Sequence, residues 1–254
     1  MKKVSNGSIQ TLTDIVHSFA TRGSEEAVKF YNGFRIIPYT YHDLYKRCCQ
    51  CAAFFTQLGL KKGDRILLWA PNGPEWIVVQ SACALTGVVS IPLDIRNTPD
   101  FILKIQEEVE ARYFFQTQYK SVPGLDIQSI FMENLFEQIE GLPEQWESPV
   151  IQPDDWISIF YTSGTTGRPK GVILTHGNIA SNIVSVLKII HVEPSYRLLS
   201  VLPLSHAFEQ TCGFWAPLHC GAKVLYLKSL KPSALFEMFQ REKVALMLTV
   251  PRLL

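Results

Sequence analysis

The fold of this 254-residue chain depends most on one stretch, Tyr161-Thr162-Ser163-Gly164-Thr165-Thr166-Gly167-Arg168-Pro169-Lys170-Gly171. Apolar residues lead into it at 156–161 and out of it at 171–174, and both runs are typical of short buried strands. Gly164 and Gly167 allow a positive φ and a close approach of the backbone to a ligand. Successive backbone N–H groups in such a loop form a concavity that binds anions. The stretch therefore predicts a phosphate-binding loop between two strands.

The side chains of the loop favour the same interpretation. Ser163, Thr165 and Thr166 add hydroxyl donors, and Arg168 and Lys170 add positive charges that can contact a phosphate. The stretch fits a Walker A loop less well. In that motif the lysine follows a glycine and leads into a helix, whereas Lys170 follows Pro169 and leads into an expected strand. The remaining alternative is a solvated surface loop, which most Gly/Ser/Thr-rich segments are.

The stretch 161–171 resembles the phosphate-loop signature of the adenylate-forming enzymes, and residues 172–178 continue the match. That superfamily includes acyl-CoA synthetases, peptide-synthetase adenylation domains and luciferases. The resemblance implies that the loop holds the β- and γ-phosphates of ATP while a carboxylate attacks the α-phosphorus. It implies a catalytic role for Lys170 and a Mg²⁺ contact for Thr166. It assigns the phosphate contacts to Thr162, Ser163, Gly164, Thr165, Thr166, Gly167 and Lys170.

Upstream of the loop, strands and helices alternate. The expected elements are strands at 65–70, 88–93 and 113–117 and helices at 75–85 and 99–111. This alternation predicts an α/β fold of mainly parallel sheets flanked by helices. By resemblance, it is the large N-terminal domain of an acyl-CoA synthetase-like enzyme, present incompletely.

The chain begins and ends with further expected elements. Near the start we expect a helix over 9–19, a two-residue hairpin turn at Asn32-Gly33 and a helix capped by Thr40 and Asp43. Later elements are a helix over 179–190, a strand at 196–202, a helix over 232–241 and a strand at 244–250.

A polar, proline-containing segment at 141–149, followed by Pro153-Asp154-Asp155, predicts a subdomain boundary. We therefore expect a first α/β subdomain over 1–150 and a truncated subdomain over 151–254 that carries the phosphate loop.

The segment 202–210 resembles a second motif of the family, in the form seen in fatty-acid-activating members. There the histidine and the next aromatic residue help line the acyl site, which assigns such roles to His206 and Phe208. A histidine near a carboxylate substrate can donate a hydrogen bond or carry charge, so His206 is also a candidate catalytic residue. Without the first motif, a core histidine at a strand end would be the preferred interpretation.

The aromatic residues Phe208, Phe214 and Trp215 suit an apolar acyl chain, although ordinary core packing would explain them as well. Relatives that activate amino acids carry an aspartate in this motif, because an α-ammonium needs an anionic partner. Glu209 is the nearest carboxylate, at a different position. We therefore expect a fatty acid as the substrate.

Composition narrows the class of protein further. A net charge of +1 gives no electrostatic case for binding nucleic acid or an anionic membrane, and the N-terminus lacks the apolar core of a signal peptide. No stretch is apolar enough for a membrane span, although peripheral contact stays open. The six cysteines, which lack zinc-site spacing, predict reduced thiols and a cytoplasmic location.

Together these features predict that the parent protein uses ATP, Mg²⁺ and coenzyme A to convert a fatty acid into acyl-AMP and then acyl-CoA. Two alternatives stay open: a fatty-acyl-AMP ligase that loads a carrier protein, and a non-catalytic nucleotide- or phosphate-binding module. The family's later adenine and ribose motifs and its small C-terminal domain are not found. We therefore expect an N-terminal fragment that is inactive by itself.

Overall fold

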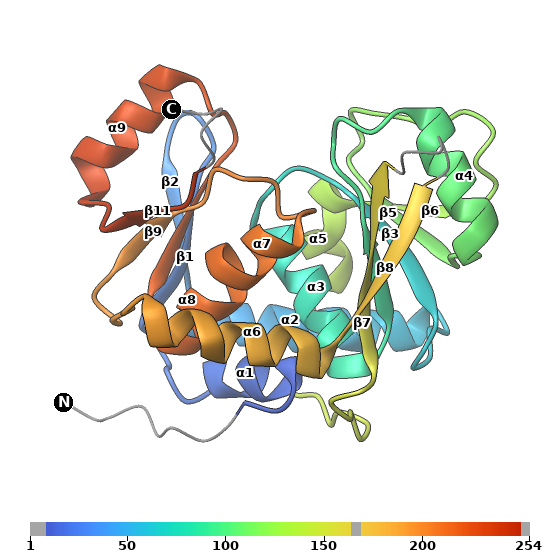
Figure 1. The fold of residues 1–254 in the computed structure, drawn as a ribbon, viewed down its shortest axis with the longest axis horizontal. Coiled ribbons are helices and arrows are strands. Elements are labelled where there is room, and N and C mark those ends of the chain that lie inside the picture. The colour runs from blue at the N-terminus through green and yellow to red at the C-terminus, as the bar shows by residue number, and fades with distance from the viewer. Residues whose placement is uncertain (1–8, 164–168, 250–254) are drawn as a thin grey trace.

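The computed structural model describes residues 9–163 and 169–249, which form two sheets with helices between and outside them (Figure 1). This architecture confirms the expected α/β fold of mainly parallel sheets flanked by helices. The strands are β1 (Glu26–Tyr31), β2 (Ile36–Thr40), β3 (Arg65–Trp69), β4 (Val89–Pro92), β5 (Tyr113–Gln116), β6 (Gln128–Phe131), β7 (Trp156–Ser163), β8 (Pro169–Thr175), β9 (Arg197–Leu199), β10 (Lys223–Leu227) and β11 (Leu246–Met247).

The helices vary widely in length, and a short π-helix joins two of them. They are α1 (Leu12–Phe19), α2 (Tyr41–Gln57), α3 (Pro74–Thr86), α4 (Pro99–Val109), the 3₁₀-helix η1 (Met132–Asn134), α5 (Leu135–Ile139), α6 (His176–Ile189), α7 (Ala207–Glu209), the π-helix η2 (Gln210–Trp215), α8 (Ala216–Cys220) and α9 (Pro232–Glu242).

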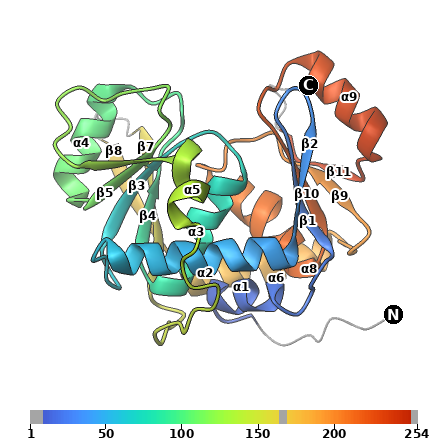
Figure 2. The ribbon, with the colours of Figure 1, turned by 180° about the vertical axis from the view of Figure 1, so that it is seen from behind.

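The two sheets differ in size and share a helical layer. The larger has the order β6-β5-β3-β4-β7-β8, and the smaller has the order β11-β9-β10-β1-β2. Only the β7–β8 and β1–β2 pairs are antiparallel among the described strand pairs. Helix α3 lies between the sheets, while α4 and α9 lie on their outer sides (Figures 1 and 2). One apolar core includes residues of both sheets, such as Val28 and Ile66, so the sheets pack on a common interior.

Each sheet takes strands from both sides of residue 150. Strands β1 and β2 pair in one sheet with β9, β10 and β11, and β7 and β8 extend the sheet of β3–β6. The expected split into subdomains 1–150 and 151–254 therefore does not separate the two sheets, and as a domain boundary it stays a prediction.

Three expected elements differ in detail. The hairpin between β1 and β2 has four connecting residues instead of two, because the Asn32 side chain accepts hydrogen bonds from the backbone N–H groups of Phe34 and Arg35. Strand β9 ends at Leu199 and β11 holds two residues, so both are shorter than their apolar runs. Strands β6 and β10, helix α5 and the helical run from α7 to α8 were not expected.

The described residues hold no helix that has both the length and the apolar character needed to cross a membrane. All six cysteines lie among these residues as buried free thiols. They pack as small apolar side chains, three of them on α2.

Candidate functional site

The β7–β8 ribbon positions the two ends of the phosphate loop. The strands pair antiparallel, with Thr162 opposite Lys170 and Ser163 opposite Pro169. Directly opposed side chains of an antiparallel pair lie on the same face, so Lys170 and Thr162 are neighbours. The expected strand–loop–strand arrangement is therefore confirmed at both ends of the loop. The predicted contacts at Gly164, Thr165, Thr166 and Gly167 lie outside the described residues, as does the side chain of Ser163.

A polar cavity of about 550 Å³ lies beside this ribbon, and both Thr162 and His206 line it. Tyr161, Ser205, Phe101 of α4 and the segment from the end of β4 to Thr98 form the rest of its wall. The structure thus brings the first residue of the predicted phosphate loop and the predicted catalytic histidine to one cavity.

A second cavity, of about 760 Å³, adjoins the first, and the two share Asp94, Arg96 and His206. Its other walls are mostly apolar and come from the segments that follow β4, β9 and β10 and from α7. They are formed by Ile95, Val201, Leu202, Pro203, Phe208, Glu209 and Leu230. His206 therefore lies where a polar cavity meets an apolar one.

The fold explains why these residues meet. Asp94 follows the carboxyl end of β4, Thr162 lies near that of β7, and residues 201–206 follow β9. Ligands of open α/β sheets bind in the crevice outside the carboxyl ends of the strands. Both cavities occupy this position, at an edge to which the two sheets contribute.

The Asn72 side chain holds the segment that leads to His206. Its amide nitrogen donates to the backbone oxygen of Leu202 at 2.7 Å, and its amide oxygen accepts from the backbone nitrogen of Leu204 at 2.8 Å. His206 then occupies the N-cap position of α7, with its own N–H donated to the oxygen of Pro203. Sequence analysis missed Asn72, whose only signal is its place in the turn 71–74.

Asp94 is fixed by its neighbours and faces His206. The guanidinium of Arg96 donates to both carboxylate oxygens, at 2.9 and 2.6 Å, and the Arg96 backbone N–H donates at 2.8 Å. Trp69 holds the Asp94 backbone oxygen through its indole N–H at 2.8 Å. The hydrogen bonds from Arg96 lower the pKa of Asp94, and the nearby His206 adds to this effect. His206 Nε2 lies 3.4 Å from Asp94 Oδ2.

The predicted acyl-site aromatics fall into two groups. Phe208 is exposed and lines the apolar cavity. Phe214 and Trp215 are fully buried and stack on each other with ring centroids 4.0 Å apart, and Phe214 meets Trp76 edge-on. The structure therefore places Phe214 and Trp215 in the core between the sheets, apart from His206 and Phe208, and their substrate contact stays a prediction.

Glu209 lies in the wall of the apolar cavity and is otherwise buried. Ser200 Oγ donates to Glu209 Oε1 at 2.5 Å, and the other carboxylate oxygen has no partner among the described residues. Burial raises the pKa of Glu209 to about 7, against which the hydrogen bond from Ser200 acts. Glu209 therefore adds a polar group to a cavity that Asp94, Arg96 and His206 also line.

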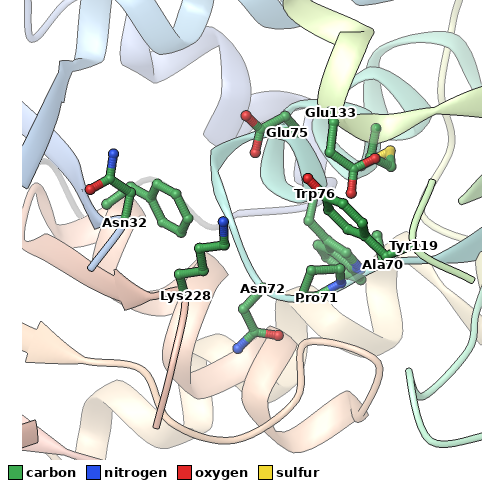
Figure 3. A pocket seen from close by; sticks show the side chains of 11 residues that line it. Asn32, Ala70, Pro71, Asn72, Glu75, Trp76, Tyr119, Glu133 and Lys228 are labelled. Carbon is green, nitrogen blue, oxygen red and sulfur yellow. The ribbon is translucent and has the colours of Figure 1, made fainter. Parts of the chain in front are cut away.

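A third cavity, of about 270 Å³, lies at the carboxyl ends of β1, β3 and β10 (Figure 3). Lys228 stands on one side of it and Glu75 and Glu133 on another. None of the predicted site residues belongs to its described lining.

The described residues fit a phosphate-bearing ligand better than a free metal ion. Thr162 and Lys170 supply a hydroxyl and a cation beside the polar cavity. Within 9–163 and 169–249 no group of three or more His, Cys, Asp or Glu side chains is arranged to hold a metal. Mg²⁺ that is bound with a nucleotide commonly takes phosphate oxygens among its ligands, and the predicted Mg²⁺ contact Thr166 lies outside the described residues.

The fold and site define an α/β protein in which two adjoining cavities, one of them mostly apolar, lie beside the strand ribbon that flanks the predicted phosphate loop. The model of the AMP-binding enzyme family matches residues 16–254, and the chain belongs to that family. It is 24% identical to the putative acyl-CoA synthetase YngI of Bacillus subtilis, over 94% of this chain and 52% of the relative. It is 27% identical to a feruloyl-CoA synthase of Amycolatopsis, over 84% and 43%.

Solved structures share the fold. The N-terminal domain of FACL13 from Mycobacterium tuberculosis superposes with a TM-score of 0.85 at 24% identity, over 96% of this chain and 63% of that one. A fatty acyl-adenylate ligase from L. pneumophila, in complex with acyl adenylate and pyrophosphate, gives a TM-score of 0.81 at 22% identity, over 94% and 44%. The chain spans about half the length, or less, of the curated relatives described here.

Proposed function

We propose that this chain is part of an ATP-dependent ligase that activates a fatty acid, first as an acyl-adenylate and then as a coenzyme A thioester. The observation that supports this most is the meeting of two cavities at His206. Thr162 lines the polar one, with Lys170 opposite it on β8, and Phe208 lines the apolar one. A carboxylate at this junction would have phosphates on one side and an apolar chain on the other.

In the proposed first step, a carboxylate oxygen of the acid attacks the α-phosphorus of ATP. The bond from that phosphorus to the bridging oxygen breaks, so acyl-AMP forms and pyrophosphate leaves. Lys170 offsets negative charge that develops on the leaving pyrophosphate, and Thr162 donates its hydroxyl to a phosphate oxygen. His206 contacts the reacting carboxylate. Mg²⁺, when bound with the nucleotide, would neutralise further phosphate charge, with Thr166 the proposed contact.

In the proposed second step, the sulfur of coenzyme A attacks the acyl carbon of the adenylate. The carbon–oxygen bond to AMP breaks, AMP leaves, and the thiol proton is released. The described residues carry no specific feature for this step. Its support is the family membership and relatives whose names describe acyl-CoA synthetases.

The choice of a fatty acid rests on the apolar cavity. Its walls of Ile95, Val201, Leu202, Phe208 and Leu230 suit a hydrocarbon chain. A feruloyl-CoA synthase and a 4-coumarate–CoA ligase are also among the relatives, so an aromatic acid is the main competitor for this cavity. Peripheral contact with a membrane is compatible with such a substrate, and buried free thiols fit a cytoplasmic location.

A ligase that stops at the adenylate, or that loads a carrier protein, is a second candidate. This candidate is considered because the chain shares its fold with a fatty acyl-adenylate ligase. Transfer of the acyl group to coenzyme A in the assay would exclude it. A phosphate-binding module without turnover would bind ATP but show no acid-dependent reaction.

The test is acid-dependent ATP–pyrophosphate exchange, measured on the protein encoded by the complete reading frame that contains this chain. We expect exchange with fatty acids, and a fall of about 100-fold in Lys170→Ala because the positive charge that offsets the negative charge on the leaving pyrophosphate is lost. Lys188→Ala is the matched control, since Lys188 is exposed on α6, away from both cavities, and its loss should leave the rate unchanged.

The panel of acids covers fatty acids of several lengths, ferulate and an amino acid. Preference for ferulate or for the amino acid would refute the fatty-acid assignment, while a normal rate in Lys170→Ala would refute the role of that lysine. The 254-residue chain by itself should bind pyrophosphate weakly and show no turnover.

A further inference from the structure

The turn that follows β3 contacts both sides of the junction between the two cavities. Trp69, the last residue of β3, donates its indole N–H to the backbone oxygen of Asp94 at 2.8 Å. Further along the turn, Asn72 contacts the backbone of Leu202 and Leu204. Asp94 lines both cavities, and Leu202 lines the apolar one. One short turn therefore holds two wall segments that are distant from each other in sequence.

The side chain of Asn72 uses both of its polar atoms. Nδ2 donates to the Leu202 oxygen at 2.7 Å, and Oδ1 accepts from the Leu204 nitrogen at 2.8 Å. A backbone C=O can only accept and a backbone N–H can only donate, so these partners fix which way the amide is turned. Leu202 and Leu204 are buried, and no other described residue forms a hydrogen bond with these two backbone atoms. Without Asn72, both atoms would lose their partner inside the protein.

The backbone on both sides of Asn72 is restrained. Pro71 precedes it with a fixed φ, and Gly73 is extended, as a residue before a proline usually is. Pro74 then opens helix α3, and the Ile77 N–H donates to the Gly73 oxygen at 3.3 Å. The Asn72 side chain is therefore placed by the end of a strand and the start of a helix, which hold a site residue more precisely than a free loop does.

The contacts of Asn72 continue to His206 through the backbone. Pro203, which lies between the two contacted leucines, accepts a hydrogen bond from the His206 N–H at 3.0 Å. Leu202 and Pro203 line the apolar cavity, and His206 lines both cavities. A shift of the segment 202–204 would therefore move the apolar wall and His206 together. The hydrogen bonds of Asn72 do not extend to the β7–β8 ribbon, which carries the two ends of the phosphate loop.

We propose that Asn72 is a positioning residue for the acid substrate, an inference that rests on the proposed function of the site. Its amide fixes the segment 202–204 and, through it, His206. The same turn fixes Asp94 through Trp69, so the two sides of the junction keep their separation. In the proposed reaction the acid lies between these two sides, so its placement depends on Asn72. The phosphates of ATP lie at the ribbon, so their binding does not depend on it.

Acid-dependent ATP–pyrophosphate exchange, measured on the protein from the complete reading frame, tests this role. In Asn72→Ala we expect kcat/KM for the fatty acid to fall by about 100-fold, since a misplacement of about 1 Å can cost that much. KM for ATP should stay nearly unchanged, because Asn72 does not hold the ribbon. If Asn72→Ala does not fold, Asn72→Asp carries the test, with the same contrast between acid and ATP expected.

Amide hydrogen exchange in the 254-residue chain, followed by nuclear magnetic resonance, reports on the contact without any need for turnover. In Asn72→Ala the Leu204 amide should lose its protection, and the His206 amide should exchange faster as well. Asn72→Asp keeps an oxygen for the Leu204 N–H but has no donor for Leu202. The Leu204 amide should therefore stay protected in this variant.

Asn32→Ala is the matched control. Asn32 also lies in a turn and also holds two backbone groups, since its Oδ1 accepts from the N–H groups of Phe34 and Arg35 at 3.0 Å each. It lines the third cavity and neither of the two that meet at the junction. Its loss should change neither the kinetics nor the exchange of the Leu204 amide.

The kinetic results separate a positioning role from a merely structural one. If folded Asn72→Ala activates the fatty acid as efficiently as the unmodified protein, Asn72 only stabilises the fold and the inference is wrong. An equal rise of KM for ATP and for the acid would mean that Asn72 supports the whole site, which also overturns the inference. If the unmodified protein activates no acid, the proposed function itself fails, whereas the exchange data still show whether Asn72 fixes the segment 202–204.

Discussion

Gly213 has almost no room for a side chain. A Cβ atom added there would lie 2.1 Å from Glu209 Oε1 and 2.4 Å from its Cδ. Glu209 cannot move away freely, because it is buried and its Oε1 accepts from Ser200. We therefore expect Gly213→Ala to lower the free energy of unfolding by about 1–3 kcal/mol, the usual cost of overpacking a core. Urea unfolding monitored by tryptophan fluorescence measures this.

A double-mutant cycle separates the clash from other effects of Gly213→Ala. Glu209→Ala removes the atoms that the new methyl group would meet, so Gly213→Ala should cost much less in that background. An equal cost in both backgrounds would show that the close contact with Glu209 is not the cause.

Sequence motifs singled out individual residues before the structure was known. His206, Phe208 and Thr162 were each predicted to be site residues, and the structure brings them to adjoining cavities. Asp94 and Asn72 were missed, because their importance comes from neighbours distant in the chain. Asn72, for example, contacts residues 202–204 across more than one hundred residues of sequence. A lone Asn or Asp in a turn carries no signal of such a contact.

Helix α2 begins with a reciprocal cap, an element whose start was predictable. The Thr40 hydroxyl accepts from the Asp43 backbone N–H at 3.0 Å, and the Asp43 carboxylate accepts from the Thr40 backbone N–H at 3.0 Å. Thr40→Ala leaves the first-turn N–H of Asp43 without this partner. We expect a loss of about 1 kcal/mol in the free energy of unfolding, measured by urea denaturation. Thr40→Ser keeps the hydroxyl and should lose little; an equal loss in both variants would contradict the capping explanation.

The other helices and strands were predictable where the sequence carries a local signal for them, such as an apolar pattern or a proline or glycine at an end. Helices α3 and α4 begin at prolines, and Gly87 follows the last residue of α3, signals that the sequence shows directly. Strand β6 has one buried residue in four, so it shows no alternation of apolar and polar residues that would predict a strand. All six residues of the π-helix η2 are buried, and a helix that is buried all round shows no helical period.

At the scale of the whole molecule, the pairing of strands that are distant in sequence determines which segments meet at the site. Strand β1 pairs with β10 across almost two hundred residues of sequence. Because β10 also pairs with β9, the strand that leads to His206 lies in the same sheet as β1. Sequence alternation predicts parallel strands, but it does not say which strands share a sheet. For that reason the two cavities at His206 were not foreseeable, although most of the residues that line them were visible as motif or strand ends.

The titration of two buried groups changes the stability of the whole chain with pH in opposite directions. Burial raises the pKa of Glu209 from 4.5 to about 7, and burial lowers the pKa of His176 from 6.5 to about 4. The stability from the raised carboxyl is full below pH 4.5 and is lost as the pH rises to 7, because the folded state then holds a proton that the unfolded state has released. The lowered histidine acts in the other direction, since between pH 4 and 6.5 the unfolded state binds the extra proton.

The two effects therefore cancel between about pH 4.5 and 6.5, and the decline from Glu209 should show alone only between pH 6.5 and 7. Replacing the carboxyl by an amide in Glu209→Gln keeps an oxygen for the Ser200 hydroxyl and removes the titration. Relative to the unmodified chain, we expect this variant to gain about 3 kcal/mol between pH 4.5 and 7, at about 1.4 kcal/mol for each unit of pKa shift. Urea unfolding at pH 4.5, 5.5, 6.5 and 7 measures the difference.

His176→Gln removes the opposing titration of His176. The free energy of unfolding of this variant should therefore fall steadily with rising pH over the whole range, because of Glu209 alone. A difference between Glu209→Gln and the unmodified chain that does not change with pH would mean that Glu209 titrates alike in the folded and unfolded states.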